Sequence, residues 1–160
     1  MNVNLVPMTA ARYERWYERS VQGYAEEKVR AGNWPAEDAL RRSREEFEHL
    51  LSSGLATPGH WLFSIVDAET GSAVGILWLA AMPAGSDGTA RAFVYDFEID
   101  ADQRRKGYGR AALLALDDRA REMGFAEIGL HVFGHNVAAR ALYEQAGYEV
   151  TNVNMSKKLR

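Results

Sequence analysis

A short segment near the middle of the chain combines cationic side chains with glycines directly after an apolar run. It reads Arg104-Arg105-Lys106-Gly107-Tyr108-Gly109-Arg110 and holds four cationic side chains within seven residues. Glycine lets the backbone approach a bulky anion closely. A helix is expected from Ala111, and the first turn of a helix has N–H groups without intrahelical partners at the positive end of its dipole. The segment therefore predicts an anion site of the phosphate type, although a solvated basic turn between a strand and a helix would have a similar sequence.

The glycine pattern differs from two common phosphate-binding motifs. The chain has no G-x-x-x-x-G-K-[ST], which disfavours an NTP-hydrolysing P-loop, and no G-x-G-x-x-G, which weakens a dinucleotide-binding interpretation. Another kind of nucleotide or dinucleotide protein stays open at this point. The antiparallel strands expected in the middle of the chain disfavour it.

Composition places the chain among ordinary globular proteins. Its 160 residues are 47% hydrophobic and 26% charged, which is typical of one soluble domain over residues 1–160. The net charge of −3 makes the basic segment a local feature and argues against nucleic acid as a partner. The chain has no cysteine, which excludes disulfides, thiolate metal sites and a cysteine nucleophile. No apolar run reaches the ~18 residues of a membrane span, and no signal-peptide core is present, so we expect a cytoplasmic protein without a membrane partner.

Strands and helices that would position the segment can be predicted from hydrophobic periodicity. Before the segment, the expected strands are residues 2–7, 61–66, 74–81 and 90–99, with one helix from Thr9 to Gly32 and another from Pro35 to Gly54. After it, a third helix ends at Gly124, and a strand over 128–133 should lie parallel to strand 90–99 because a helix connects the two. Asn136 can cap a fourth helix that ends at Gly147, and residues 148–150 and 153–159 should form a final hairpin.

A second motif starts 27 residues after Gly109 and reads Asn136-x-x-Ala139-x-x-Leu142-Tyr143-x-x-x-Gly147-Tyr148. Together with Arg104-x-x-Gly107-x-Gly109, it resembles the GNAT superfamily of acyl-CoA-dependent N-acetyltransferases. The first motif is similar to that family's Q/R-x-x-G-x-G/A turn and the second to its N-x-x-A-x-x-L-Y-x-x-x-G-F/Y helix. The chain departs from the pattern at two places: Arg105 stands where the family usually has glycine, and Ala101 where proline is frequent.

The resemblance implies a fold as well as an activity. The expected architecture is α+β, an α/β/α sandwich with a mixed, mostly antiparallel sheet of about six or seven strands and four helices. The sheet is expected to be splayed between strands 4 and 5. The implied enzyme is an acetyltransferase that moves the acetyl group of acetyl-CoA directly to an amine acceptor, and a homodimer is expected from family habit alone.

The resemblance also assigns residues to coenzyme A. Main-chain amides of the basic turn would hold its pyrophosphate, the main chain of Phe97 and Ile99 would bond its pantetheine arm, and Asn136 and Tyr143 would lie near that arm and the sulfur. The expected cofactor-binding residues are thus Phe97, Ile99, Arg104, Arg105, Lys106, Gly107, Tyr108, Gly109, Arg110, Asn136 and Tyr143. No set of histidines and carboxylates shows metal-ligand spacing, so we expect no metal.

Acetyl transfer sets two chemical requirements. A lysine-like amine has a pKa of roughly 10 and must lose a proton before it attacks; the candidate bases are His131 and Asp96, although a structural role for either has to be considered. The leaving thiolate must also be stabilised, and Tyr143 is the candidate because the family places a tyrosine there. Full proton transfer from an ordinary phenol to the thiolate is uphill by ~2 kcal/mol, so a hydrogen bond that strengthens in the transition state is the better expectation.

Glu98 should face the same side of the sheet as Asp96, and under strict alternation Tyr95 should face the other. The histidines His49, His60 and His135 are expected to be exposed or in loops. The acceptor amine is left open by the sequence. A CoA-binding sensor module without catalysis is the alternative function.

Overall fold

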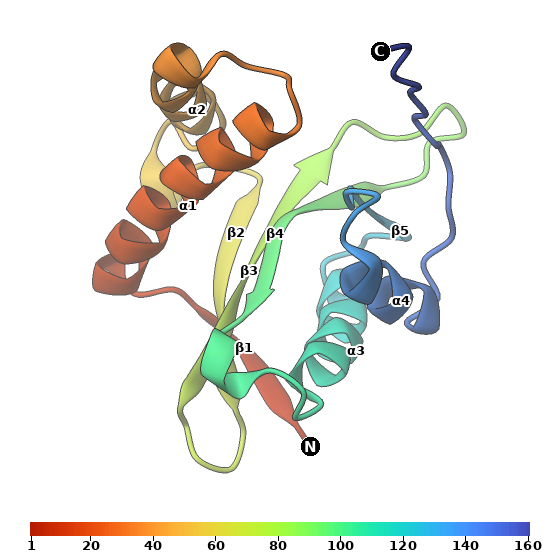
Figure 1. Ribbon diagram of the computed structural model, residues 1–160. Coiled ribbons are helices and arrows are strands. Elements are labelled where there is room, and N and C mark those ends of the chain that lie inside the picture. Colours follow the sequence, from red (N-terminus) through yellow and green to blue (C-terminus); the bar gives the residue numbers. More distant parts are fainter.

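The computed structural model describes all residues from 1 to 160 and arranges them as one sheet with helices on both faces (Figure 1). The strands are β1 (Val3–Pro7), β2 (His60–Asp67), β3 (Ala73–Met82), β4 (Arg91–Ile99) and β5 (Glu127–Leu130). The helices are α1 (Ala10–Arg30), α2 (Ala36–Leu50), α3 (Tyr108–Glu122) and α4 (Val137–Gln145), with short 3-10 turns η1 (Gly54–Ala56) and η2 (Ala101–Gln103).

The sheet has five strands in the order β1-β2-β3-β4-β5. The first four are antiparallel, and β5 pairs parallel to β4. The expected α+β fold with four helices is therefore confirmed, but the expected count of six or seven strands is wrong. The two strands predicted over 148–150 and 153–159 are absent, because no residue beyond Leu130 is in a strand.

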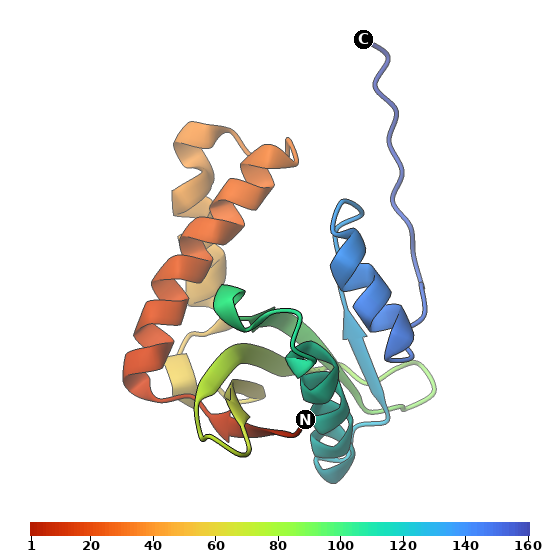
Figure 2. The same ribbon diagram turned by 60° about the horizontal axis from the view of Figure 1, so that its bottom comes forward.

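Alternating side chains of the central strands build two cores, one on each face of the sheet. Ile76 and Trp78 of β3 pack with Trp16 of α1 and Phe47 of α2, whereas residue 77 between them packs with α3 on the opposite face. This is the period of two that a strand buried on both faces requires. Helices α1 and α2 therefore lie on one face of the sheet and α3 and α4 on the other, as Figures 1 and 2 show.

Helix α1 begins where its sequence predicts. Thr9 Oγ1 accepts a hydrogen bond from the N–H of Arg12 at 3.2 Å, which satisfies one of the N–H groups at the helix start. The helix runs unbroken through Gly23 to Arg30. Buried Ser43 of α2 donates to the Val21 carbonyl oxygen at 2.6 Å and joins the two helices.

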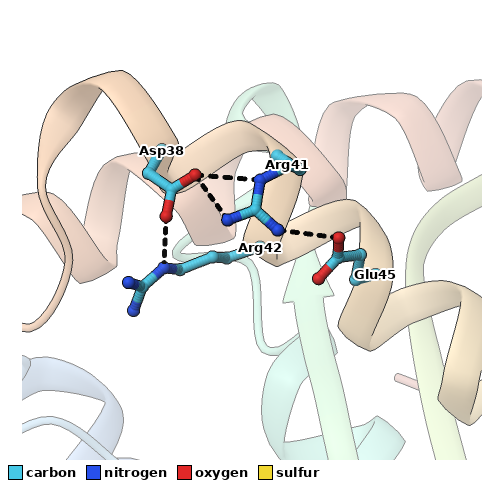
Figure 3. A network of polar contacts seen from close by, with 4 residues as sticks. All are labelled: Asp38, Arg41, Arg42 and Glu45. Carbon is cyan, nitrogen blue, oxygen red and sulfur yellow. Dashed lines mark hydrogen bonds and ion pairs between the residues drawn. The ribbon is translucent and has the colours of Figure 1, made fainter.

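The outer face of α2 carries ion pairs between residues one turn apart (Figure 3). Asp38 accepts from Arg41 and Arg42, and Arg41 also donates to Glu45 at 2.8 Å. Exposed pairs of this kind contribute little to stability. This face of α2 is therefore solvated, and the sheet lies on the opposite side of the helix pair.

No helix of the chain is both long enough and apolar enough to cross a membrane.

Candidate functional site

Strand β4 contains a β-bulge at the centre of the candidate site. Trp78 of β3 pairs with Asp96, but the next residue, Leu79, pairs with Val94, so Tyr95 is an extra residue in β4. A bulge lets two consecutive side chains lie on the same side of the sheet. The expectation of strict alternation is wrong for this reason: the Tyr95 ring stacks on Trp78 at 4.7 Å, on the α1 side, where Asp96 also lies.

Asp96 lies in a partly buried position below α1. The indole N–H of Trp16 donates to its Oδ2 at 2.9 Å. Burial raises the pKa of Asp96 from its ordinary value of 3.8 to about 6; the Trp16 hydrogen bond lowers it, and the charge of Glu98 raises it again. A carboxylate with a pKa near 6 is ionised at neutral pH and is much more basic than an ordinary aspartate.

Glu98 lies on the same side of β4, as its spacing from Asp96 predicts. Its carboxylate is 3.6 Å from Arg19 and 3.7 Å from Arg104, and its side chain is 37% exposed. The two acidic residues of β4 therefore differ in environment, since Asp96 is held by a neutral indole and Glu98 is paired with cations.

Tyr143 of α4 lies on the other side of β4, with its ring centre 6.2 Å from that of Phe97 and 5.8 Å from that of Tyr148. Burial raises the pKa of Tyr143 to about 12, and the negative charge of Asp96 adds to the increase. The hydroxyl of Tyr143 has no hydrogen-bond partner in the protein, and it is not among the fully buried orphan polar atoms, unlike the hydroxyl of Tyr148. Tyr143 therefore has a largely buried ring and a hydroxyl that is free to donate a hydrogen bond.

The basic turn presents a row of free backbone donors. None of the seven consecutive N–H groups from Arg104 to Arg110 donates to a carbonyl or side-chain acceptor of the protein. Gly107 is the N-cap of α3 with φ 90° and no side-chain cap. Arg105 has φ 61°, the left-handed conformation that glycine adopts without strain. The row of free N–H groups at a helix start, beside exposed cationic side chains, fits a diphosphate.

Side chains of the turn have separate partners. Arg104 Nε donates to the Ile99 carbonyl oxygen at 3.0 Å, and Lys106 Nζ to Gln103 Oε1 at 3.2 Å. The buried Tyr108 hydroxyl donates to Asp67, so only the main chain of Tyr108 is available to an anion.

The absence of a side chain at Gly109 has a packing reason in the structure. A Cβ built at Gly109 would lie 3.0 Å from Leu142 Cδ2 of α4, and only open space surrounds a Cβ at Gly107 apart from Met1 Sδ at 3.9 Å. Gly109 thus lets α3 and α4 approach each other, whereas Gly107 supplies a backbone angle.

Pairing between β4 and β5 covers only part of β4. Its register runs from Arg91↔Glu127 to Val94↔Leu130 and stops there. The residues beyond the bulge, Phe97 and Ile99 among them, pair with β3 alone. Their main chain on the β5 side is available to another partner, apart from the Ile99 carbonyl that Arg104 already contacts.

The sequence predicted a strand over 128–133 that would include His131. This prediction is wrong for His131, because β5 ends at Leu130. The His131 side chain is exposed and meets the Phe133 ring edge-on at 4.9 Å. Asn136 caps α4 as expected: its Oδ1 accepts from the Ala139 N–H at 3.3 Å, which leaves its side-chain NH₂ free to donate. The negative charge of Asp96 thus raises the pKa of Tyr143 from across β4, whereas His131 lies at the surface.

Sequence reasoning missed the aromatic residues around Asp96. His60 was expected to be exposed or in a loop, but it begins β2 and is half-buried, and its Nδ1 accepts from the Trp78 indole N–H at 2.9 Å. Burial lowers the pKa of His60. Its ring also stacks on Tyr95 at 6.0 Å. The alternation of β2 and β3 could have placed His60 near Trp78, but the contact with Tyr95 depends on the bulge.

No three potential metal-ligating side chains of the chain lie close enough together to hold an ion.

Comparison with known proteins yields a family match over most of the chain. The model described as the acetyltransferase (GNAT) family matches residues 14–148. The uncharacterized N-acetyltransferase YycN of Bacillus subtilis is 45% identical over 159 residues, covering 99% of this chain and 100% of that protein. The uncharacterized N-acetyltransferase YdgE of the same organism is 35% identical and covers 99% of both chains. The crystal structure of YycN superposes with a TM-score of 0.90 over 99% of each chain.

Proposed function

Because the chain belongs to the GNAT acetyltransferase family, we propose that it transfers the acetyl group of acetyl-CoA directly to an amine acceptor. One observation carries the residue assignment: a partly buried carboxylate, Asp96, lies in the second half of β4, and a row of seven free N–H groups follows in the turn after that strand. This arrangement would place a diphosphate-bearing co-substrate at the turn and a base, Asp96, in β4. The resemblance seen in the two sequence motifs is thereby confirmed at the level of the family.

Backbone groups of this chain make most of the proposed contacts with acetyl-CoA. The N–H groups of Arg104–Arg110 hold the diphosphate, and the side chains of Arg105, Lys106 and Arg110 add charge around it. The pantetheine arm bonds to the free main-chain edge of β4 at Phe97 and Ile99, as an added strand would. For this, β4 and β5 must stay apart beyond Val94, where their pairing ends. The side-chain NH₂ of Asn136 donates to the same arm.

Asp96 is proposed as the base. Its raised pKa lets it accept a proton at neutral pH, directly or through a water molecule, from the ammonium form of the acceptor. Trp16 donates to Oδ2, and no other side chain donates a hydrogen bond to this carboxylate. His131 is the less suitable base because its side chain lies at the surface beyond β5. The amide N–H of Phe97 or Ile99 would meet the oxyanion.

Tyr143 is proposed to stabilise the leaving sulfur through a hydrogen bond. With a pKa of about 12, the phenol would have to give its proton to a thiolate of reference pKa ~8.5, a step uphill by roughly 5 kcal/mol. A hydrogen bond that shortens as negative charge develops avoids this cost. The absence of a protein partner for the hydroxyl supports the assignment, since the donor is free.

A cationic acceptor is favoured by the charge on α1. Glu27 Oε2 has no hydrogen-bond partner although it is buried, and it lies 3.7 Å from His135 Nε2 in the connection after β5. Its other oxygen accepts from Arg30 at 3.1 Å. An ammonium group placed between α1 and this connection would supply the missing partner of Glu27.

Release of free thiol from acetyl-CoA, measured against a panel of amines and peptides, tests the proposal. We expect turnover with at least one amine and a loss of it in Asp96→Asn. Binding of acetyl-CoA in calorimetry without thiol release for any amine would instead favour the sensor module. Absence of any binding would refute the diphosphate assignment.

A further inference from the structure

One side chain of the basic turn is fixed in the protein core. Tyr108 is the first residue of α3, and its side chain is 8% exposed. It is the only buried residue between 101 and 110, and its ring packs in the core between the sheet and α3. Tyr108 is therefore the side chain that attaches the row of free N–H groups to the core.

The Tyr108 hydroxyl is bonded to a carboxylate from a distant part of the chain. It donates to Oδ2 of Asp67, the last residue of β2, which lies 41 positions earlier in the sequence. The other two side-chain hydrogen bonds of residues 101–110, from Arg104 and Lys106, reach acceptors no more than five positions away. The bond between Tyr108 and Asp67 is thus the only side-chain hydrogen bond that joins this segment to another part of the fold.

Asp67 is itself held by the turn between β2 and β3. Its Oδ1 accepts from the backbone N–H groups of Glu69 at 2.8 Å and Thr70 at 3.1 Å, and its own N–H donates to the Ser72 carbonyl oxygen at 2.9 Å. These hydrogen bonds, that of Tyr108 foremost, lower the pKa of Asp67, so the carboxylate is ionised at neutral pH. A hydrogen bond to an ionised acceptor is stronger than one between neutral groups. The start of α3 is therefore tied to a rigid point.

We propose that Asp67 is a positioning residue for acetyl-CoA: through the Tyr108 hydroxyl it holds the first turn of α3 in the orientation that binds the diphosphate. The inference rests on the proposed function, in which the free N–H groups of the turn receive that diphosphate. Arg105 and Gly107 both have positive φ, and this conformation costs Arg105 free energy. The turn therefore needs an outside attachment to keep its shape before the ligand arrives, since ordering it on binding would lower the affinity.

A purely structural role for the bond is the alternative. However, the body of α3 has attachments of its own. Arg119 donates to the Leu5 carbonyl oxygen of β1 at 3.0 Å, and Leu113 and Leu116 are almost fully buried. These contacts hold the helix on the sheet without the Tyr108 hydroxyl. The hydroxyl therefore matters chiefly for the first turn of α3, where the N–H groups are free.

Tyr108→Phe in the full chain tests the inference, with Tyr24→Phe as the matched control. Both variants lose one phenolic hydroxyl, but the Tyr24 ring packs in the core on the opposite face of the sheet. Phenylalanine keeps the ring that fills the core at position 108, so the fold is retained. Calorimetry gives the dissociation constant of acetyl-CoA, and hydrogen exchange without ligand gives the mobility of the amides of residues 104–110. The same measurements on Asp67→Ala and on the double variant show whether the hydroxyl acts through Asp67.

A donor without the diphosphate separates positioning from a general loss of stability. S-acetylpantetheine carries the same thioester and arm as acetyl-CoA but has no diphosphate. Its kcat/KM is measured by thiol release, with an amine from the panel as the acceptor. We expect Tyr108→Phe to leave this kcat/KM unchanged, together with the kcat at saturating acetyl-CoA, because the proposed reacting groups of β4 and α4 keep their places.

We expect Tyr108→Phe to raise the dissociation constant of acetyl-CoA roughly 10-fold, the cost of ordering one or two more groups on binding, and to speed exchange of the amides of residues 104–110. Tyr24→Phe should do neither, and Tyr108→Phe should have no further effect in the Asp67→Ala background. Three results would overturn the inference. These are an unchanged affinity in Tyr108→Phe, an equal loss with S-acetylpantetheine, and the same loss in the presence and absence of the Asp67 carboxylate. A wild type that binds no acetyl-CoA would refute the diphosphate site of the proposed function and this inference with it.

Discussion

Replacing Asp96 with asparagine should make the protein more stable and less active at the same time. The pKa of this carboxyl is raised from 3.8 to about 6, chiefly by burial. The folded state therefore binds the proton more tightly than the unfolded state does. As the pH rises from about 4 to about 6, the unfolded chain is already ionised, so the free energy of unfolding falls across this window.

The size of the effect follows from the shift. A difference of about 2 pKa units corresponds to a penalty of at most ~3 kcal/mol, fully present above pH 6. Asparagine has a similar shape, keeps an oxygen that can accept from the Trp16 indole at 2.9 Å, and carries no charge. We therefore expect Asp96→Asn to raise the free energy of unfolding by up to ~3 kcal/mol at pH 7 to 8. The gain should disappear below pH 4.

Urea denaturation at five pH values between 3.5 and 8, without acetyl-CoA, measures the stability. Thiol release under saturating acetyl-CoA measures the activity, which we expect to fall by ~10²- to 10⁴-fold, the usual contribution of a general base. Glu98→Gln is the control, since Glu98 is on the same strand and side but is paired with Arg19 and Arg104. It should change stability by less than ~1 kcal/mol at every pH.

Two results would refute this reasoning separately. If Asp96→Asn and the wild type had parallel stability curves from pH 3.5 to 8, the pKa of Asp96 would not be raised. If stability increased as expected but activity was unchanged, the carboxylate would be buried and strained without serving as the base.

Three further variants test other parts of the site. Tyr143→Phe should lower kcat more than the affinity for acetyl-CoA, because the free hydroxyl would act on charge that develops only in the transition state; an unchanged kcat would exclude it from the chemistry. Arg105→Gly should raise the free energy of unfolding by ~1 kcal/mol, since it removes left-handed strain, whereas Lys106→Gly, at a residue without positive φ, should not stabilise; equal effects in chemical denaturation would contradict the strain. His131→Ala should leave the acidic limb of the pH–rate profile in place, and disappearance of that limb would identify His131 as the base.

Hydrophobic periodicity was sufficient to predict most of the elements. The strand predicted over 74–81 is observed as Ala73–Met82, and the cap at Asn136 is observed with its hydrogen bond to Ala139. These features depend on residues close together in the sequence, where alternation and capping chemistry act. The basic turn could be predicted for the same reason, because its glycines and cationic residues are close together in the sequence.

The features that the sequence did not predict depend on contacts across the sheet. The bulge at Tyr95 is a property of the pairing between β4 and β3, and the residues of β4 alone do not indicate it. The hydrogen bond between Trp16 and Asp96 joins residues 80 positions apart. The final hairpin was wrong for another reason: the apolar residues within 153–159 favour a strand, but in the structure these residues pair with no other strand.

Placement of the bulge connects the two halves of the proposed site. Pairing with β5 ends at Val94, and Tyr95, the next residue, is the extra one. A bulge bends a strand and increases its twist, and this bulge lies directly after the last residue of β4 that pairs with β5. The same extra residue brings the Asp96 side chain to the α1 face and leaves the main chain of Phe97 without a neighbour on the β5 side. One insertion in the pairing of β4 thus bears on both the proposed base and the edge proposed to hold the pantetheine arm. The family resemblance had named these residues, but strict alternation did not predict that Tyr95 and Asp96 would share a face of the sheet.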